Sequence, residues 1–193
     1  MFTWVLIRYS PASLLYAAKR AVKRKDMLME LWDVYDKNRL LTGKTAERGK
    51  PLPEGGYHMV VHICLFNHKG QMLIQQRNAF KHGWPNLWDV TAGETSAQAA
   101  QRELFEEIGY ATDFSALRPY LTINFPNGFD DYYLLEREVD LPLLKLQEEE
   151  VQAVAWAHKD EILEMIAQER FVPHRSGFIS LLFEMFVPKE SAL

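Results

Sequence analysis

The chain has 193 residues, of which 48% are apolar and 25% charged, and its 22 Lys and Arg against 26 Asp and Glu give a formal net charge of −4. This length suffices for one domain with a sizeable core, and no apolar run is long enough to cross a membrane. A single cysteine, Cys64, excludes a disulfide framework and a cysteine-based zinc cluster, and it fits a reducing compartment.

The basic side chains are concentrated at the N-terminus. Residues 1–26 contain six Lys and Arg against one acidic residue, a net charge of +5, so the rest of the chain carries −9. A body of that sign repels nucleic acid, because its field opposes that of the phosphates. We therefore expect neither a nucleic-acid partner nor a membrane partner for the body.

Residues 1–26 allow three interpretations. They could form an organelle transit peptide, a basic helix at a surface or membrane, or translated upstream sequence without a role. We take them as a basic, non-catalytic N-terminal extension and residues 27–193 as the functional domain. We expect a cytoplasmic protein, with organelle targeting by the extension left open.

The first half of the domain is predicted to be rich in strands, because aliphatic and β-branched runs alternate with turn residues. The turn sequence at Asn67–Gly70 predicts that the strands on either side pair as a hairpin. Residues 43–56 are predicted to form a polar connection. The expected strands are Leu28–Tyr35, Arg39–Thr42, His58–Phe66, Gln71–Arg77 and Leu87–Ala92.

The strongest predicted helix, Ser96–Ile108, follows these strands. Thr95 or Ser96 caps its start, and Gly109 ends it. Strands before, between and after helices in a chain of this length predict one mixed α/β sandwich with helices on its faces. The remaining expected elements are strands at Arg118–Phe125, Phe129–Val139 and Val151–Ala157, and helices at Lys159–Gln168 and Gly177–Phe186.

Three carboxylates lie close together on the predicted helix. At about 100° per residue, Glu103, Glu106 and Glu107 fall within roughly 100° of its circumference. Each such like-charge pair costs an isolated helix about 0.2–0.5 kcal/mol. A hard divalent cation would offset that repulsion, because carboxylate oxygens suit Mg²⁺ or Mn²⁺. The alternative is a solvated acidic face with Arg102 as its local counter-charge.

The pattern R-E-L-F-E-E-I-G-Y resembles the core of the Nudix hydrolase signature, G-x5-E-x7-R-E-U-x-E-E-x-G-U, in which U is a bulky aliphatic residue. Tyr110 replaces the last aliphatic residue. The resemblance implies a Nudix-like α/β/α sandwich with a mixed β-sheet over residues 28–186. The positions in register with the signature are Glu94, Arg102, Glu103, Leu104, Glu106, Glu107 and Gly109.

The resemblance also implies the chemistry. It suggests an acid anhydride hydrolase that uses Mg²⁺, or Mn²⁺, to cleave a diphosphate linkage in a nucleoside diphosphate derivative or a related small metabolite. Glu106 and Glu107 would hold the metal, Glu103 would be a ligand or the base, and Arg102 would orient the carboxylates. The metal would neutralise phosphate charge and lower the pKa of a bound water.

Two further residues are candidates for the site. Some family members take their base from a distal loop, and Glu149, within the acidic segment 146–151, lies at a suitable place in the chain. A solvated acidic loop is the alternative for that segment. Arg77, at the end of a predicted strand, is a candidate substrate-binding residue, because a guanidinium suits phosphate.

The amino-terminal half of the signature does not fully match this sequence. Trp88 stands where the signature requires glycine. If Gly93 is that glycine instead, five residues are missing between it and Glu94. We favour the second interpretation, because the residues before Gly93 look like the usual strand that enters the loop. A shortened loop predicts impaired activity, whether the gap is natural, engineered or a gap in the recorded chain.

Two rival functions stay open. A catalytically silent Nudix-like binding module would explain the shortened loop. Residues 30–36, 58–66, 75–77 and 84–88 also look like the branch that contains isopentenyl-diphosphate isomerase. That enzyme needs a cysteine in the segment held here by Thr91, Ala92 and Gly93. Cys64 lies in a hairpin strand and is most simply a core residue.

Other side chains have simpler interpretations. His58 and His62 point to the same face of a predicted strand, as structural residues or as a metal pair. We expect a small-molecule diphosphate as the partner of the site and leave a homodimer open.

The aromatic residues that could stack on a base, or equally fill the core, are Trp84, Trp88, Tyr132 and Tyr133.

Overall fold

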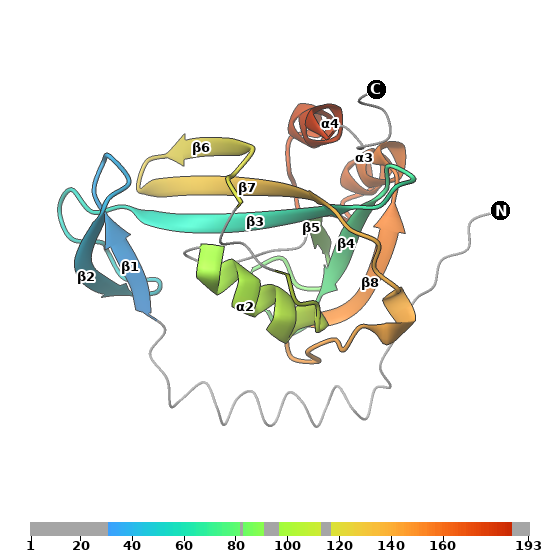
Figure 1. The fold of residues 1–193 in the computed structure, drawn as a ribbon, viewed down its shortest axis with the longest axis horizontal. Coiled ribbons are helices and arrows are strands. Elements are labelled where there is room, and N and C mark those ends of the chain that lie inside the picture. The colour runs from blue at the N-terminus through green and yellow to red at the C-terminus, as the bar shows by residue number, and fades with distance from the viewer. Residues whose placement is uncertain (1–30, 82, 91–96, 113–116, 187–193) are drawn as a thin grey trace.

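The fold is described from a computed structural model (Figure 1). The structure describes residues 31–81, 83–90, 97–112 and 117–186, without the side chains of residues 97–100, 102 and 103. The basic extension at residues 1–26 therefore lies outside the described residues. Within the described ranges, no helix is both long and apolar enough to span a membrane.

A mixed six-stranded sheet forms the centre of the domain, with strand order β5-β4-β3-β7-β6 and with β8 paired to β4. A separate two-stranded sheet, β1-β2, lies at one end (Figure 1). The strands are β1 (Leu31–Tyr35), β2 (Leu41–Glu47), β3 (His58–Phe66), β4 (Met72–Arg77), β5 (Trp88–Val90), β6 (Leu121–Phe125), β7 (Gly128–Glu136) and β8 (Val151–Ala157). The helices are α2 (Ala97–Ile108), the 3-10 turn η1 (Leu141–Leu143), α3 (Lys159–Ala167) and α4 (Ser176–Met185).

The helices cover opposite faces of the strands. Helix α2 lies on one face, and α3 and α4 lie on the other (Figure 1). Successive residues of a strand point to opposite faces, so Ile63 and Leu65 of β3 pack towards α2, whereas Cys64 and Phe66 pack towards α3 and α4. This layering confirms the predicted α/β/α sandwich with a mixed sheet.

Strands β3 and β4 diverge soon after their shared turn. They pair at Phe66 and Met72, whereas β3 runs parallel to β7 from His58 to Phe66. Strand β4 instead pairs antiparallel with β8 on one edge and with β5 on the other. The predicted hairpin is thus present at its turn, and the sheet opens into two halves because each strand has another partner.

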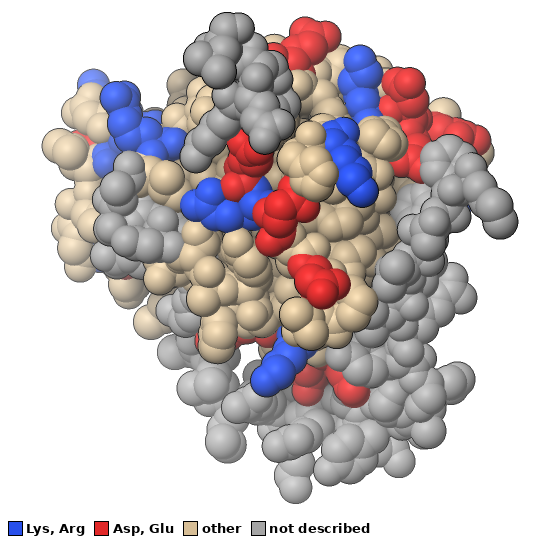
Figure 2. Space-filling model, turned by 45° about the vertical axis from the view of Figure 1, so that its right-hand side comes forward, with Lys and Arg blue, Asp and Glu red and all other residues tan. Residues whose placement is uncertain are grey.

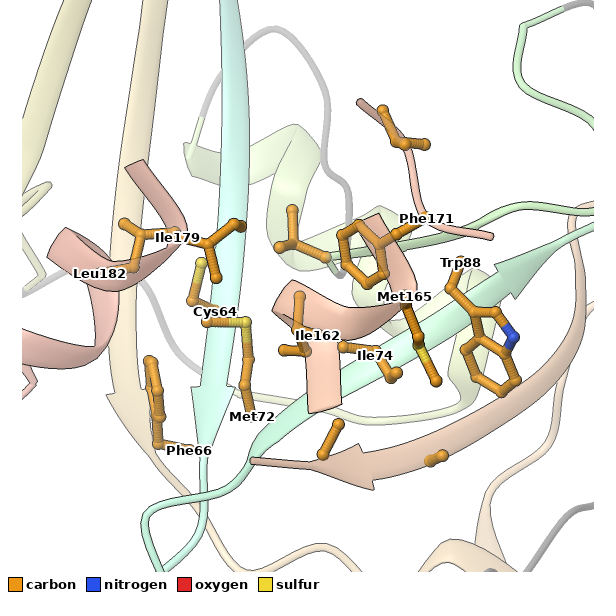
Figure 3. Close-up of a cluster of buried hydrophobic side chains, with 14 of the residues drawn as sticks. Cys64, Phe66, Met72, Ile74, Trp88, Ile162, Met165, Phe171, Ile179 and Leu182 are labelled. Atoms are coloured by element: carbon orange, nitrogen blue, oxygen red, sulfur yellow. The ribbon is translucent and has the colours of Figure 1, made fainter. Parts of the chain in front are cut away.

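A large apolar cluster fixes the position of α3 and α4 on the sheet (Figure 3). It joins β3, β4 and β5 to both helices, and each fully buried aliphatic or aromatic side chain contributes about 1.5–3 kcal/mol. Phe171 follows α3 and packs here together with Trp88 of β5. The labelled members are Cys64, Phe66, Met72, Ile74, Trp88, Ile162, Met165, Phe171, Ile179 and Leu182.

The boundaries of several elements differ from those predicted. Strand β2 extends to Glu47, beyond the predicted end at Thr42, because Leu31 of β1 pairs with Glu47. Strand β5 is limited to Trp88–Val90, and residues 91 and 92 of the predicted strand lie outside the described residues. Strand β6 begins at Leu121 rather than at Arg118.

Arg39 ties the β1-β2 hairpin to the main sheet. Its guanidinium forms an ion pair with Asp131 of β7, and its Nη1 donates to Thr122 Oγ1 of β6 at 2.9 Å. Asp131 is only 2% exposed, so these partners replace the water that its carboxylate loses on burial. Asp36 Oδ1 accepts hydrogen bonds from the backbone N–H groups of Leu40 and Asn38, which lower the pKa of Asp36 and stabilise the turn before Arg39.

Replacement of Arg39 should therefore destabilise the fold. We expect Arg39→Met to lower the free energy of unfolding by about 2 kcal/mol, below the roughly 3–5 kcal/mol of a fully buried pair because the Arg39 side chain is partly exposed. Urea unfolding measures the change, and Lys44→Met in exposed β2 is the matched control. Equal unfolding free energies for the two variants would contradict a stabilising contact between Arg39 and the main sheet.

Candidate functional site

Glu107 is a buried carboxylate on α2. It is 5% exposed, and its Oε2 accepts a hydrogen bond of 3.1 Å from Gln75 Nε2 of β4. Leu104 and Ile108 are fully buried and anchor the same side of the helix against the sheet. Since residues three apart lie on one helix face, Glu107 points inward with Leu104, whereas Glu106 is exposed.

The groups around Glu107 suit a hard divalent cation. The amide oxygen of Gln75, Oε1, is buried and has no hydrogen-bond partner among the described residues. A buried carboxylate beside an unsatisfied amide oxygen is an oxygen donor set of the kind that Mg²⁺ prefers. Among the side chains that the structure describes, no three potential ligands form a complete metal site.

The other predicted ligands divide into two groups. Glu106 belongs to the same helix turn as Glu107 but lies on its exposed side. The side chains of Arg102 and Glu103, and the whole of Gly93 and Glu94, lie outside the described part of the chain. Their roles, and the shortened loop, stay predictions. Gln75 was not predicted, although a polar residue in the middle of the buried run Met72–Arg77 was a usable signal.

Arg77 lies two residues beyond Gln75, on the same face of β4. Its Nε donates to the carbonyl oxygen of Gly83 at 2.9 Å, and its Nη1 lies 3.5 Å from Asp89 Oδ2 of β5. The guanidinium is therefore held in a defined position by the protein itself. Its predicted contact with substrate stays a prediction.

Asp89 binds a second basic side chain, His174. Its Oδ1 lies 3.0 Å from His174 Nε2 and also accepts the backbone N–H of Val90 at 2.9 Å. The chain after α3 runs parallel beside β5, since Trp88 donates to Arg170 O and Val172 donates to Trp88 O. That pairing brings His174 to a residue 85 positions earlier, which explains why the sequence did not reveal the contact.

The acidic segment with Glu149 is held against the end of α2. Gln147 donates its backbone N–H to Glu107 O at 2.8 Å. The buried Asn78 holds the rest of the turn through two hydrogen bonds. Its side chain donates to Glu148 O at 2.6 Å, and its backbone N–H donates to Glu150 O at 2.9 Å. Glu149 itself is half-buried, and its role as a base stays a prediction.

The two predicted strand histidines have different neighbours. His58 stacks on Trp32 at 4.2 Å between ring centroids, and burial lowers its pKa. His62 stacks on Tyr132 at 4.4 Å, with Nε2 3.3 Å from Asp130 Oδ1. No metal site of three potential ligands includes either ring among the described residues.

The predicted stacking residues differ in exposure, and Cys64 lies in the core. Trp88 is buried in the cluster of Figure 3, whereas Trp84 is 51% exposed. Tyr133 is buried on the face towards α2. Cys64 is fully buried, and this burial raises its pKa to about 12, so the thiol is a packing residue.

Charged side chains of both signs are mixed on the face drawn in Figure 2. Lysines and arginines alternate there with aspartates and glutamates, and the described residues form no continuous basic groove on this face.

Comparison with known proteins gives the family. Residues 56–182 match the family model of the NUDIX domain, which includes α2 and the Gln75–Glu107 pair. The chain belongs to the Nudix family. An uncharacterized Nudix hydrolase of Listeria monocytogenes is 44% identical over 163 residues, with 81% of this chain and 95% of that protein covered.

Two further comparisons give a more distant relative and a solved structure of similar fold. An isopentenyl-diphosphate Delta-isomerase of Streptomyces coelicolor is 29% identical over 154 residues, covering 73% of this chain and 77% of the isomerase. The crystal structure of a Deinococcus radiodurans protein superimposes with a TM-score of 0.60 at 20% identity, covering 82% of this chain and all of that one. The latter likeness supports the Nudix fold.

Proposed function

We propose that this Nudix protein is a Mg²⁺-dependent hydrolase of a diphosphate linkage in a nucleoside diphosphate derivative or a related metabolite. The observation that carries the proposal is the buried Glu107 carboxylate, held by Gln75 on the signature helix. The Listeria relative is named a Nudix hydrolase, which supports the same reaction class.

The residues of α2 and Gln75 would bind the metal ion and orient its ligands. Glu107, with Glu103 and Glu106, would hold Mg²⁺, and Mn²⁺ would suit the same oxygens. The bound ion would neutralise phosphate charge and acidify water. Gln75 fixes the Glu107 carboxylate by donating to Oε2, and Arg102 would orient its neighbours on the helix.

The remaining candidate residues would bind the substrate or accept a proton. Arg77 is held by Asp89 and Gly83 on the face of β4 that also carries Gln75, a placement that supports a role in binding the diphosphate. Glu149, on the turn anchored by Asn78, is the base suggested by the sequence. We expect a cytoplasmic enzyme with a small-molecule substrate, because the body is acidic and the chain has a single cysteine, which fits a reducing compartment.

Isomerase activity is the second candidate, because isopentenyl-diphosphate isomerases are among the relatives. That chemistry requires a cysteine where this chain has residues 91–93. Cys64 cannot replace it, since the thiol is fully buried and its pKa is raised by that burial. A silent binding module is the third candidate, and it differs from both enzymes by the lack of turnover.

A substrate panel tests the hydrolase directly. We expect Mg²⁺-dependent phosphate-ester products from nucleoside diphosphate sugars, dinucleoside polyphosphates or isopentenyl diphosphate, and loss of activity in EDTA. Glu107→Gln should lower kcat by about 100-fold or more, since even loss of a supporting partner of a metal ligand costs 10–100-fold. Glu138→Gln, on an exposed glutamate paired with His68, is the matched control.

Each other outcome of the panel has a definite meaning. Isomerised isopentenyl diphosphate without phosphate release would make the protein an isomerase. Binding of these compounds without turnover would make it a silent module. Turnover that Glu107→Gln leaves unchanged would contradict the role of the signature helix.

The shortened loop generates its own prediction. Insertion of five residues after Gly93 should raise kcat, because the longer chain could wrap around the diphosphate before it enters α2. The control carries the same five residues after Pro51, in an exposed connection. Equal turnover of the unmodified chain and the Gly93 insertion would contradict impairment by the loop.

A further inference from the structure

Asp89 connects two basic side chains from different parts of the chain. Its Oδ1 lies 3.0 Å from His174 Nε2, and its Oδ2 lies 3.5 Å from Arg77 Nη1. The carboxylate is 9% exposed, so both contacts are shielded from solvent. The carboxylate therefore holds both the guanidinium of Arg77 and the imidazole of His174.

The contact with Asp89 determines which nitrogen of His174 can act. A carboxylate accepts a hydrogen bond, so Nε2 carries the proton and Nδ1 of the neutral ring has a free lone pair. Among the described residues, no group pairs with Nδ1 of His174, and 18% of the side chain is exposed. The ring is thus a fixed proton acceptor with an accessible nitrogen.

Aromatic rings surround the imidazole on its other sides. Phe171 and Phe178 lie with ring centroids 6.1 and 6.3 Å from it, and Phe178 packs edge-on against Tyr132 of β7. Of the described residues, the charged or titratable groups near His174 include Asp89 of β5 and Arg77 of β4, followed by Tyr132 and Cys64, which interact electrostatically with Asp89. Burial raises the pKa of Tyr132, so its hydroxyl stays neutral, and the exposed Arg175 follows in the chain.

Asp89 links His174 to the Glu107 site. Asp89 is the cross-strand neighbour of Gln75 in the β4-β5 ladder, which places their Cα atoms about 4.5–5.5 Å apart. Gln75 donates to Glu107, and side chains of directly opposed residues share one face of the sheet. A substrate at Glu107 would therefore lie near Asp89, whose carboxylate holds His174.

We propose that His174 is the proton acceptor in the hydrolysis and that Asp89 is its positioning residue. The inference rests on the proposed hydrolase function. Nδ1 takes a proton from the attacking water as the water oxygen forms its bond to phosphorus. The bridging P–O bond breaks, its electron pair leaves with the bridging oxygen, and the imidazolium returns the proton to the departing phosphate or to solvent.

Kinetics of matched variants test this role. We expect His174→Gln to lower kcat by about 100-fold or more, with KM changed less than threefold and the fall of kcat at acid pH lost, because a base contributes about 10²–10⁴-fold. Asp89→Asn should shift the acid limb and lower kcat less. His68→Gln removes an exposed histidine that also contacts a carboxylate, Glu138, and should leave the rate unchanged.

A second readout does not depend on turnover. Nitrogen-15 NMR of ring-labelled protein should show the Nε2-protonated tautomer at His174, with the signal assigned by its absence in His174→Gln. The non-hydrolysable methylenediphosphonate, added with Mg²⁺, should shift this signal and leave that of His68 unchanged. This arm separates failure of the inference from failure of the hydrolase: a wild-type chain without turnover can still show the shift.

Several outcomes would overturn the inference. They are a kcat for His174→Gln equal to that of the wild type, a change confined to KM, an Nδ1-protonated tautomer, or a His174 signal that methylenediphosphonate does not move. Loss of the acid limb in Glu149→Gln instead would assign the base to Glu149. Urea unfolding of His174→Gln shows whether its fold is intact.

Discussion

The divergence of β3 and β4 is the constraint on which the rest of the structure depends. Both strands belong to one sheet, yet they pair at their shared turn and then separate, because β3 is taken up by β7 and β4 by β5 and β8. The half of the sheet around β4 carries the polar residues Gln75 and Asp89 on the face that packs against α2 through Leu73 and Val154. Gln75 points from β4 towards α2, and Asp89 is its paired residue on the neighbouring strand β5.

The buried Glu107 carboxylate is the costly feature of this arrangement. A carboxylate loses hydration on burial, and hydrogen bonds such as the one from Gln75 Nε2 offset part of that loss. Apolar packing of Leu104 and Ile108 keeps the helix in place despite that cost. A bound cation would also satisfy the Gln75 amide oxygen, which has no hydrogen-bond partner among the described residues.

Local sequence was informative where the chemistry is local. The spacing of the signature residues on α2 is visible in the sequence, and the family model matches the segment that contains them, although the structure buries Glu107 and leaves Glu106 exposed. The extent of β2, the opening between β3 and β4, and the Asp89–His174 contact depend on pairing between distant segments. Asp89 lies in a strand that is buried, where a single acidic residue has no periodic pattern to mark it. His174 is brought to it by the pairing of Trp88 with Phe171.

Magnesium binding tests the central claim, that Gln75 and Glu107 form one metal-binding unit. Calorimetric titration of Mg²⁺ should give a Kd about 10–100-fold weaker for Gln75→Leu than for the wild type. Gln76→Leu, at the adjacent residue whose amide donates to Asn86 O on the other face of β4, should bind Mg²⁺ like the wild type. Equal Kd values for the two variants, or no Mg²⁺ binding by the wild type, would contradict the claim.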